Sequence, residues 1–325
     1  MKIFRLAVPL LLAASLLPGA PPEIYQHINH AVWLVRSLDG PLRGWKTLGL
    51  SDVSEFGKVR FQGEYRGRPV SGRARMAWGH LGNLAVDMLQ PESGDTAFNA
   101  FLASHGDGIF AMVYQASRPE MDHEVARLQA LGVPVLQRIE IATRRGPALF
   151  TFFDTEPKGK YVLGLVDWPA GAAPKAAPQT VSHFAFVIRQ ARPVSDFWEQ
   201  LGFPAMPVSH ATPRADSRYH GQPLLLSFDV GWHRYGHPIF EWIIPPSEPN
   251  NCYADFLKEH GEGVHHLGMS VENLNEAIAH YKTLGYIPVQ SGAWGDVGKP
   301  GSGQYSYMST DSIGGVTVEL IRGYN

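Results

Sequence analysis

The sequence predicts an α+β fold made of four copies of one unit, a strand and a helix followed by three strands, arranged as two domains. The first observation is a short phrase that recurs four times, each time at the end of a predicted helix. Its copies are Trp45-Lys-Thr-Leu-Gly49, Leu128-Gln-Ala-Leu-Gly132, Trp198-Glu-Gln-Leu-Gly202 and Tyr281-Lys-Thr-Leu-Gly285. The second observation is the spacing, because the first and third copies lie 153 positions apart, as do the second and fourth. This spacing predicts a duplicated pair of units.

Each unit begins with a strand-like apolar run, and the runs from Val181 to Ile188 and from Gly263 to Ser270 are the clearest. A helix follows, and in the last unit Asn273 can cap its start. Gly285 then supplies the left-handed residue at which helices often end. Three short strands complete the unit. The last of these strands is predicted over Phe240 to Ile244 in the third unit and over Val316 to Ile321 in the fourth.

A segment rich in proline and alanine separates the two halves of the chain. It runs from Pro169 to Gln179 and has no apolar periodicity, which is typical of a linker. We therefore expect one domain over residues 23–168, a linker over 169–179 and a second domain over 180–325.

Residues 1–22 have the pattern of a signal peptide. Lys2 and Arg5 precede an apolar run from Leu6 to Leu17, which is long enough for a signal-peptide core and too short to span a bilayer. Cleavage is expected after Ala20, although Pro21 follows directly. The alternatives are a plain N-terminal helix or an uncleaved anchor. We expect export to the periplasm or the medium and no stable membrane insertion after processing, with a cytoplasmic location as the alternative.

Composition favours a small-molecule partner. The 325 residues have a net charge of -2 and no run of lysine or arginine, so nucleic acid and anionic membranes are not expected as partners. The single cysteine, Cys252, cannot form an internal disulfide. The protein is expected to be a monomer or a homodimer.

Alternation along the strands assigns four ligand-type side chains to one face. Successive residues of a strand point to opposite sides of the sheet. His183 and His266 therefore lie opposite apolar neighbours, and Glu241 and Glu319 do so on the last strands of their units. A carboxylate on the inner face of a curved sheet is costly to bury unless it is paired or binds a cation. Two imidazoles and two carboxylates that converge on one cavity would suit a divalent ion such as Zn, Ni, Mn, Co or Fe(II).

Two phrases in the second half resemble a known superfamily. Gly261-Glu-Gly-Val-His-His266-Leu-Gly before a capped helix, together with Gly314-Gly-Val-Thr-Val-Glu319-Leu, resembles the second half of methylmalonyl-CoA epimerases and their glyoxalase I relatives. These enzymes belong to the vicinal oxygen chelate superfamily, which also includes extradiol dioxygenases. The resemblance is specific over residues 180–325 and concerns only the organisation of the chain over 28–168.

The resemblance implies two vicinal oxygen chelate domains and a set of metal ligands in the second. Its four ligand positions fall on His183, Glu241, His266 and Glu319, and it chooses His266 over His265, as the face argument does. The same resemblance suggests that Glu319 or Glu241 can leave the metal and act as a base. The tyrosines before the last strand, Tyr305 and Tyr307, are expected to line the substrate pocket, with a packing role as the alternative.

The first half keeps only part of this pattern. His30 lies 153 positions before His183, and Asp87 lies 154 positions before Glu241. With a gap of two residues, Ala111 and Gly164 stand at the positions of His266 and Glu319. We therefore expect the first domain to be a metal-free scaffold, with its Trp33 and Trp45 in the core.

Several reactions are compatible with such a site. A metal with a displaceable position can polarise a carbonyl and stabilise an enolate after proton removal, which favours a lyase or isomerase of the glyoxalase or epimerase kind. The segment Arg218-Tyr-His-Gly-Gln222 lacks the acidic residues that the epimerases carry there, which argues against a CoA epimerase. The first alternative is an Fe(II) extradiol-type dioxygenase with three protein ligands. The second is a non-catalytic binding protein of the same fold.

Overall fold

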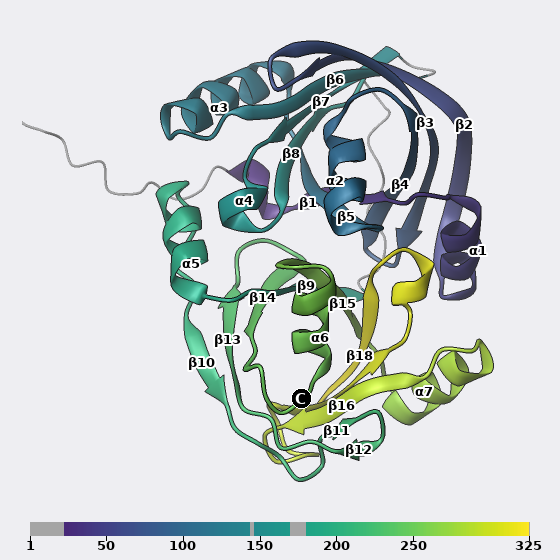
Figure 1. Ribbon diagram of the computed structural model, residues 1–325, viewed down its shortest axis with the longest axis vertical. Helices are drawn as coiled ribbons and strands as arrows, with labels where there is room; N and C mark the ends of the chain where they lie inside the picture. Colours follow the sequence, from purple (N-terminus) through teal and green to yellow (C-terminus); the bar gives the residue numbers. More distant parts are fainter. Residues whose placement is uncertain (1–22, 144–145, 170–179, 325) are drawn as a thin grey trace, which may run out of the picture.

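The structure is a computed structural model that describes residues 23–143, 146–169 and 180–324. Its strands form two curled sheets, one from each half of the chain, with some helices on their outer surfaces and α2 and α6 across their ends (Figure 1). The predicted signal peptide over 1–22 and nearly all of the predicted linker over 169–179 lie outside the described residues, so both stay predictions. Among the described residues, no helix is both long and apolar enough to span a bilayer.

The first sheet closes into a barrel of eight strands in the order β1-β4-β3-β2-β6-β7-β8-β5. Its strands are β1 (Ile28–Leu34), β2 (Leu50–Tyr65), β3 (Arg68–Leu81), β4 (Leu84–Ser93), β5 (Gly108–Gln115), β6 (Val135–Thr143), β7 (Gly146–Phe153) and β8 (Val162–Asp167). The strands β2 and β3 are much longer than predicted. They pair with each other along most of their length, residues Phe61 to Tyr65 before the turn pair with β6, and most side chains along β2 are exposed.

The second sheet curls in the same way but is an open sheet of ten strands, in which one strand of this plan is broken, and we call it the second barrel. Its order is β10-β13-β14-β9-β15-β18-β17-β16-β11-β12. Its strands are β9 (Val181–Val187), β10 (Val208–Ala211), β11 (Arg218–Tyr219), β12 (Gln222–Pro223), β13 (Phe228–His233), β14 (Ile239–Ile244), β15 (Gly263–Ser270), β16 (Pro288–Trp294), β17 (Ser302–Met308) and β18 (Thr317–Tyr324). In the first barrel one strand, β2, pairs with both β3 and β6, whereas here β10 pairs with β13 and the separate β11 pairs with β16.

Each unit has one helix, as predicted, and this helix packs on the outside of its sheet. These helices are α1 (Asp39–Thr47), α3 (Arg118–Ala130), α5 (Ala191–Gln200) and α7 (Leu274–Thr283). Each is followed by the glycine of its recurring phrase, and Gly49, Gly132, Gly202 and Gly285 all have φ between 81 and 101°. The Asn273 side chain accepts hydrogen bonds from two backbone N–H groups at the start of α7. The order of strand, helix and three strands holds in three units, and in the third unit five shorter strands, β10 to β14, follow the helix. The α+β fold class is confirmed.

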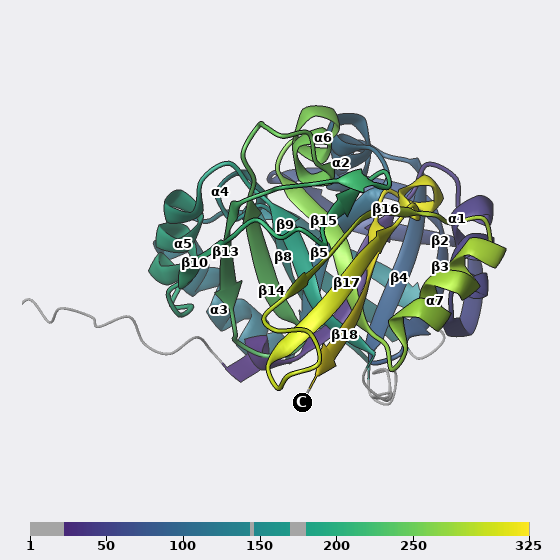
Figure 2. The ribbon, with the colours of Figure 1, turned by 90° about the horizontal axis from the view of Figure 1, so that it is seen from below.

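Two further helices were not predicted. They are α2 (Ala97–His105) and α6 (Cys252–Glu259), which precede the second and fourth units and begin after the capping residues Thr96 and Asn251. Both lie on the same side of the molecule, each at one end of its barrel (Figure 2). Side chains of α2 join the apolar interior of the first barrel, and side chains of α6 join that of the second. The shorter helical pieces are η1 (Glu23–Gln26), α4 (Glu156–Gly159) and η2 (Asp311–Ile313).

The largest apolar core runs between the two barrels. It contains buried side chains from both halves, including Trp33 and Trp45, which are fully buried as predicted. Each indole also donates a hydrogen bond to the other half: Trp33 to the carbonyl of Gly314 at 2.6 Å and Trp45 to that of Ile313 at 2.7 Å. These bonds give the buried indole N–H groups partners and hold η2 of the second domain against α1 and β1 of the first.

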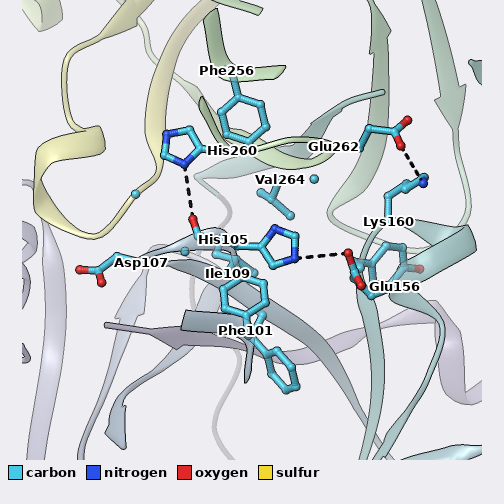
Figure 3. A pocket seen from close by; sticks show the side chains of 15 residues that line it. Phe101, His105, Asp107, Ile109, Glu156, Lys160, Phe256, His260, Glu262 and Val264 are labelled. Carbon is cyan, nitrogen blue, oxygen red and sulfur yellow. Dashed lines mark hydrogen bonds and ion pairs between the residues drawn. The ribbon is translucent and has the colours of Figure 1, made fainter. Parts of the chain in front are cut away.

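The seam between the barrels encloses a cavity of about 30 Å³ (Figure 3). Its lining contains pairs of residues that are 155 positions apart, namely Phe101 with Phe256, His105 with His260, and Asp107 with Glu262. Glu262 forms an ion pair of 2.8 Å with Lys160. A space of this size holds no more than about two water molecules. The cavity is therefore part of the packed interface and too small for an organic substrate.

Candidate metal centre

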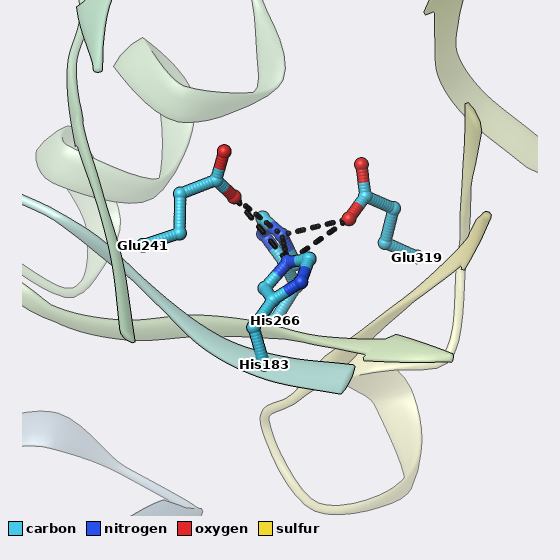
Figure 4. A group of neighbouring side chains, drawn as sticks. All are labelled: His183, Glu241, His266 and Glu319. Carbon is cyan, nitrogen blue, oxygen red and sulfur yellow. Dashed lines mark hydrogen bonds and ion pairs between the residues drawn. The ribbon is translucent and has the colours of Figure 1, made fainter. Parts of the chain in front are cut away.

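Four adjacent strands of the second sheet carry the four predicted ligands. In the order β14-β9-β15-β18, these strands supply Glu241, His183, His266 and Glu319. Glu241 stands beside Ala185, and His183 stands beside Gly268, which in turn pairs with Glu319. The four side chains therefore leave the sheet at nearly the same level and on the same face. One ligand atom from each lies within 4.8 Å of all the others (Figure 4).

The contacts within the cluster bring together nitrogen and oxygen atoms that all carry lone pairs. The Nε2 atoms of His183 and His266 are 3.3 Å apart. Glu319 Oε2 lies 3.2 Å from the first of these nitrogens and 3.3 Å from the second, and Glu241 Oε2 lies at 3.3 and 3.4 Å. Two carboxylates and two imidazole lone pairs in one place repel one another unless a cation lies between them.

Burial makes this arrangement more demanding. His183, His266 and Glu319 are 5, 0 and 6% exposed. The Oε2 atom of Glu319 is buried and makes no hydrogen bond in spite of its short distances. An unpartnered carboxylate oxygen in a buried position is costly unless an ion satisfies it. The donor set of two nitrogens and two oxygens fits a divalent metal ion of the Zn, Mn, Fe(II), Co or Ni type.

The pKa values of the cluster reflect the same preference for positive charge. Burial acts to lower the pKa of His183, but its contacts with Glu241 and Glu319 outweigh burial and raise that pKa to about 10. Burial acts to raise the pKa of Glu319, but the charge of His266 and the contact with His183 lower it to about 2. The pKa of Glu241 is lowered too, because both imidazoles outweigh its burial. Both carboxylates therefore stay ionised at neutral pH and favour a cation beside them.

A glycine creates the space for one ligand ring. A Cβ atom added at Gly268 would overlap the imidazole of His183 and lie 2.6 Å from its Nε2. Gly268 is in ordinary strand conformation, so the need for glycine here is a close approach and not a backbone angle. This position in β15 is therefore coupled directly to the site.

The tyrosines predicted to line the pocket lie beside the cluster. Tyr307 stands opposite Glu319 across the β17–β18 pair, and its ring centroid is 4.8 Å from that of His266. The Tyr307 hydroxyl lies 2.7 Å from that of Tyr253 on α6. The Tyr305 ring lies 5.3 Å from that of Tyr307, and burial raises the pKa of Tyr305. Tyr307 is only 2% exposed, so access to the cluster from its side would need movement of neighbouring groups.

Sequence reasoning did not identify Trp232 and His233 of strand β13 as neighbours of the cluster. Trp232 pairs with Glu241 across β13–β14, and its ring centroid is 5.5 Å from that of His183. His233, the next residue of the strand, is 5% exposed, and burial lowers its pKa to about 4. Phe228, Val230 and Trp232 alternate along β13 with Asp229, Gly231 and His233, so this alternation was a signal that could have found the strand.

The strand pairing of the first barrel matches that of the second position by position. Val32 pairs with Asp87 as Ala185 pairs with Glu241. Val113 pairs with Gly164 as Gly268 pairs with Glu319. The offsets of 153 to 155 positions predicted from the repeat therefore describe the actual register.

At the ligand positions and beside them, the two barrels differ in the size of their side chains. In the first barrel Ala111 replaces His266, Val113 replaces Gly268 and Gly164 replaces Glu319. A Cβ atom at Gly164 would lie 2.9 Å from a methyl carbon of Val113. Five phenylalanines fill much of the remaining interior, namely Phe61, Phe98, Phe110, Phe150 and Phe152. The space that the second barrel gives to ligands is thus occupied by apolar side chains.

Two polar residues remain in the first barrel at ligand positions. His30 and Asp87 are 0 and 3% exposed, and His30 Nε2 and Asp87 Oδ1 have no hydrogen-bond partner. Burial lowers the pKa of His30 to about 3 and raises that of Asp87 to about 7. Both residues therefore favour their neutral forms, unlike their counterparts in the second barrel.

Residues 182–303 match the protein family described as the Glyoxalase/Bleomycin resistance protein/Dioxygenase superfamily. The matched segment covers most of the second barrel and contains three of the four clustered residues. The second half of the chain therefore carries a vicinal oxygen chelate domain, as the resemblance implied. No curated protein matches the chain.

Solved structures extend the likeness to both halves. A triple mutant of 4-hydroxymandelate synthase from Streptomyces coelicolor is 16% identical, with 94% of each chain covered and a TM-score of 0.60. A xylose isomerase-like TIM barrel/4-hydroxyphenylpyruvate dioxygenase fusion protein is 11% identical, with 94% of this chain and 50% of that protein covered and a TM-score of 0.50. The Mn(II)-bound glyoxalase from Novosphingobium aromaticivorans is 14% identical, with 92 and 83% covered and a TM-score of 0.48. The first two likenesses show that both barrels have the vicinal oxygen chelate fold.

Proposed function

We propose that the protein is a metal-dependent enzyme that acts on a small oxygenated substrate in its second barrel. The observation that carries this proposal is the buried cluster of His183, Glu241, His266 and Glu319, whose ligand atoms lie within 4.8 Å of one another. The superfamily match over residues 182–303 supports it independently. A divalent metal ion bound there would act as a Lewis acid toward oxygen atoms of the substrate.

We propose a lyase or isomerase of the glyoxalase or epimerase kind as the reaction class. Four protein residues around one ion leave a carboxylate that can be exchanged for substrate. Glu319 or Glu241 would then remove a proton from the carbon next to a substrate carbonyl and return it at a neighbouring position or on the other face. Tyr305 and Tyr307 would line the space beside them, and the burial of the cluster would keep water from competing for that proton.

An Fe(II) dioxygenase is the second candidate, because one observation favours it. The chain covers 94% of 4-hydroxymandelate synthase and half of a fusion protein that contains a 4-hydroxyphenylpyruvate dioxygenase, with barrels in the same arrangement. Dioxygenase chemistry on Fe(II) uses two histidines and one carboxylate and leaves open positions on the metal. Glu241 is then the residue that separates the two candidates, since a fourth protein ligand occupies one of those positions.

The test compares proton exchange with oxygen uptake. The full-length protein is loaded with Mn, Co, Ni, Zn or Fe(II), and deuterium incorporation into 2-hydroxy carbonyl compounds and thiol hemithioacetals is followed without oxygen. Exchange that needs the metal and is lost in Glu319→Gln supports the lyase or isomerase. Oxygen uptake with catechols or 4-hydroxyphenylpyruvate under Fe(II), without such exchange, supports the dioxygenase.

A metal-free preparation that takes up none of these ions would contradict both enzyme proposals and favour a binding protein.

Three further proposals concern the whole chain. The domains extend over 23–168 and 180–325, the protein is exported by residues 1–22, and the first barrel is a scaffold without metal.

A further inference from the structure

Each first strand of the four units has a β-bulge at the same place. Between neighbouring pairs in the register, the extra residues are Asn29 in β1, Phe110 in β5, Ser182 in β9 and His265 in β15. Each of these residues directly precedes the ligand position of its unit, which is His30, Ala111, His183 or His266. A bulge leaves its extra residue out of the pairing and turns its side chain away from the regular alternation.

The bulge brings the preceding side chain to the ring nitrogen that faces away from the cluster. Ser182 Oγ lies 3.1 Å from His183 Nδ1, and His265 Nδ1 lies 2.8 Å from His266 Nδ1. In the first barrel Asn29 Oδ1 lies 2.8 Å from His30 Nδ1. Every unit that has a histidine at the ligand position thus also has a polar side chain in its bulge. The unit with Ala111 has a phenylalanine there.

The hydrogen bonds of these side chains determine which nitrogen carries the proton. The Ser182 hydroxyl donates to the carbonyl oxygen of Gly268 at 3.1 Å, so toward His183 it acts as an acceptor. His183 then donates from Nδ1, so a cation that displaces the proton on Nε2 would find this nitrogen free to bind it. For the Nδ1–Nδ1 contact, one ring must donate and the other accept. If His266 Nε2 faces a metal, His266 donates from Nδ1 and His265 accepts.

The surroundings of His265 fix the acceptor in place. Its ring is 4% exposed and lies 5.1 to 5.7 Å, between ring centroids, from Tyr253, Phe256 and Tyr307. Metal-bound histidines almost always donate their other N–H to a partner that fixes the tautomer and the ring orientation. Here a neutral imidazole would replace the carboxylate or carbonyl that usually takes this part.

We propose that the bulge residues Ser182 and His265 are positioning residues that hold His183 and His266 as Nδ1–H tautomers with both Nε2 atoms directed at one cation. This inference rests on the proposed metal centre. It assigns a role to His265, which neither the face argument nor the superfamily resemblance selected. It also explains why the two adjacent histidines are both buried.

The test uses Co(II) and the full-length protein. His265→Leu removes the acceptor but keeps an apolar side chain of similar size, whereas His265→Asn keeps an acceptor atom at the position of Nδ1, as Asn29 does beside His30. We expect His265→Leu to weaken Co(II) binding by about 10- to 100-fold and His265→Asn to restore most of it. The visible absorption of bound Co(II) should change in His265→Leu, because its intensity depends on the ligand geometry. The thermal unfolding midpoint without metal serves as the check that the variants fold.

Ser182→Ala is a smaller change that tests the partner of His183. Asn29→Leu in the first barrel is the matched control, and it should bind Co(II) as the unaltered protein does. If His265→Leu and Ser182→Ala both bind Co(II) with the affinity and spectrum of the unaltered protein, the inference is overturned and the metal centre stays intact. Loss of binding in His265→Asn as severe as in His265→Leu would also overturn it, since shape alone would then account for the effect. A protein that binds no Co(II) at all would contradict the proposed function itself.

Discussion

The ligand residues differ from ordinary buried polar residues because all four bring a lone-pair atom to the same point. Removing one of them should leave too few donors for the ion. We expect His266→Ala and Glu319→Gln each to reduce metal affinity by more than the roughly 100-fold that loss of a ligand's hydrogen-bond partner can cost. Isothermal titration with Zn or Co(II) measures this. Asp87→Asn in the first barrel should leave the affinity unchanged, and an equal loss there would mean that the active half has been misassigned.

Gly268 provides a test that removes no ligand. Gly268→Ala would push its Cβ into the ring of His183, so the ring must move out of line with the other three ligands. We expect metal affinity and activity to fall by at least about tenfold, while far-UV circular dichroism stays the same. Gly263→Ala is the matched control on the same strand, because a Cβ there meets nothing within 4 Å. Unchanged metal binding in Gly268→Ala would show that the sheet yields to the added methyl group.

Asp87 should make stability depend on pH. Burial raises its pKa from 3.8 to about 7, so the folded protein holds the proton more tightly than the unfolded chain does. The resulting stabilisation is fully present below about pH 3.8 and is lost as the pH rises through 7. Asp87→Asn cannot ionise, and its free energy of unfolding should lack this loss, which amounts to as much as about 4 kcal/mol. Urea unfolding at pH 5 and pH 8.5 measures the difference, and parallel curves for both proteins would contradict the prediction.

At the scale of elements, the sequence was most informative where a local signal coincided with the repeat. The glycines that end the four unit helices and the faces of β9, β15 and β18 could be predicted because residue type and periodicity agree there. The helices α2 and α6 could not, because they lie between units and show no recurring phrase. The loop between β16 and β17 covers residues 295–301, whereas the serines and glycines on either side of it, such as Gly292 and Ser302, belong to the two strands.

The same reasoning explains what could be predicted of the site. All four clustered residues could be named in advance because each is the only ligand-type residue on the inner face of its strand within the unit. The bulge residues escaped, since a bulge is a property of the pairing between two strands and leaves no mark in either strand alone. His265 was therefore set aside as pointing away, although it lies 2.8 Å from His266.

Helix α7 offers a prediction at the element scale. The Asn273 side chain accepts hydrogen bonds from the N–H groups of Asn275 at 3.1 Å and Glu276 at 3.3 Å, and so caps the first turn. Asn273→Ala should lower the free energy of unfolding by about 1 kcal/mol. Urea denaturation measures the loss, and Asn273→Ser, which can still cap, should recover most of it. Metal affinity should stay constant in both variants, because α7 lies on the outer face of the sheet.

At the scale of the molecule, the two barrels are one structure in spite of their different interiors. Core side chains from both halves interlock, and the indoles of Trp33 and Trp45 donate to carbonyls of the opposite half. Residues that line the seam occur in pairs 155 positions apart, so the interface itself repeats. The first barrel can therefore support the second mechanically without sharing its chemistry, which is the role proposed for it.

Glycine lies at position 164 in the first barrel, where the second has Glu319, and at position 268 in the second, where the first has Val113. This difference shows which substitutions would build a second metal site in the first barrel. Asn29, His30 and Asp87 already stand where a second ion would require them. The combination of Ala111→His, Val113→Gly and Gly164→Glu would complete the set, although Phe152, 3.1 Å from the new Cβ at 164, would have to shrink as well. Such a protein should be less stable when stripped of metal and should bind two Co(II) ions per chain. If only one Co(II) ion binds per chain, the missing ligands alone do not account for the lack of a metal site in the first barrel.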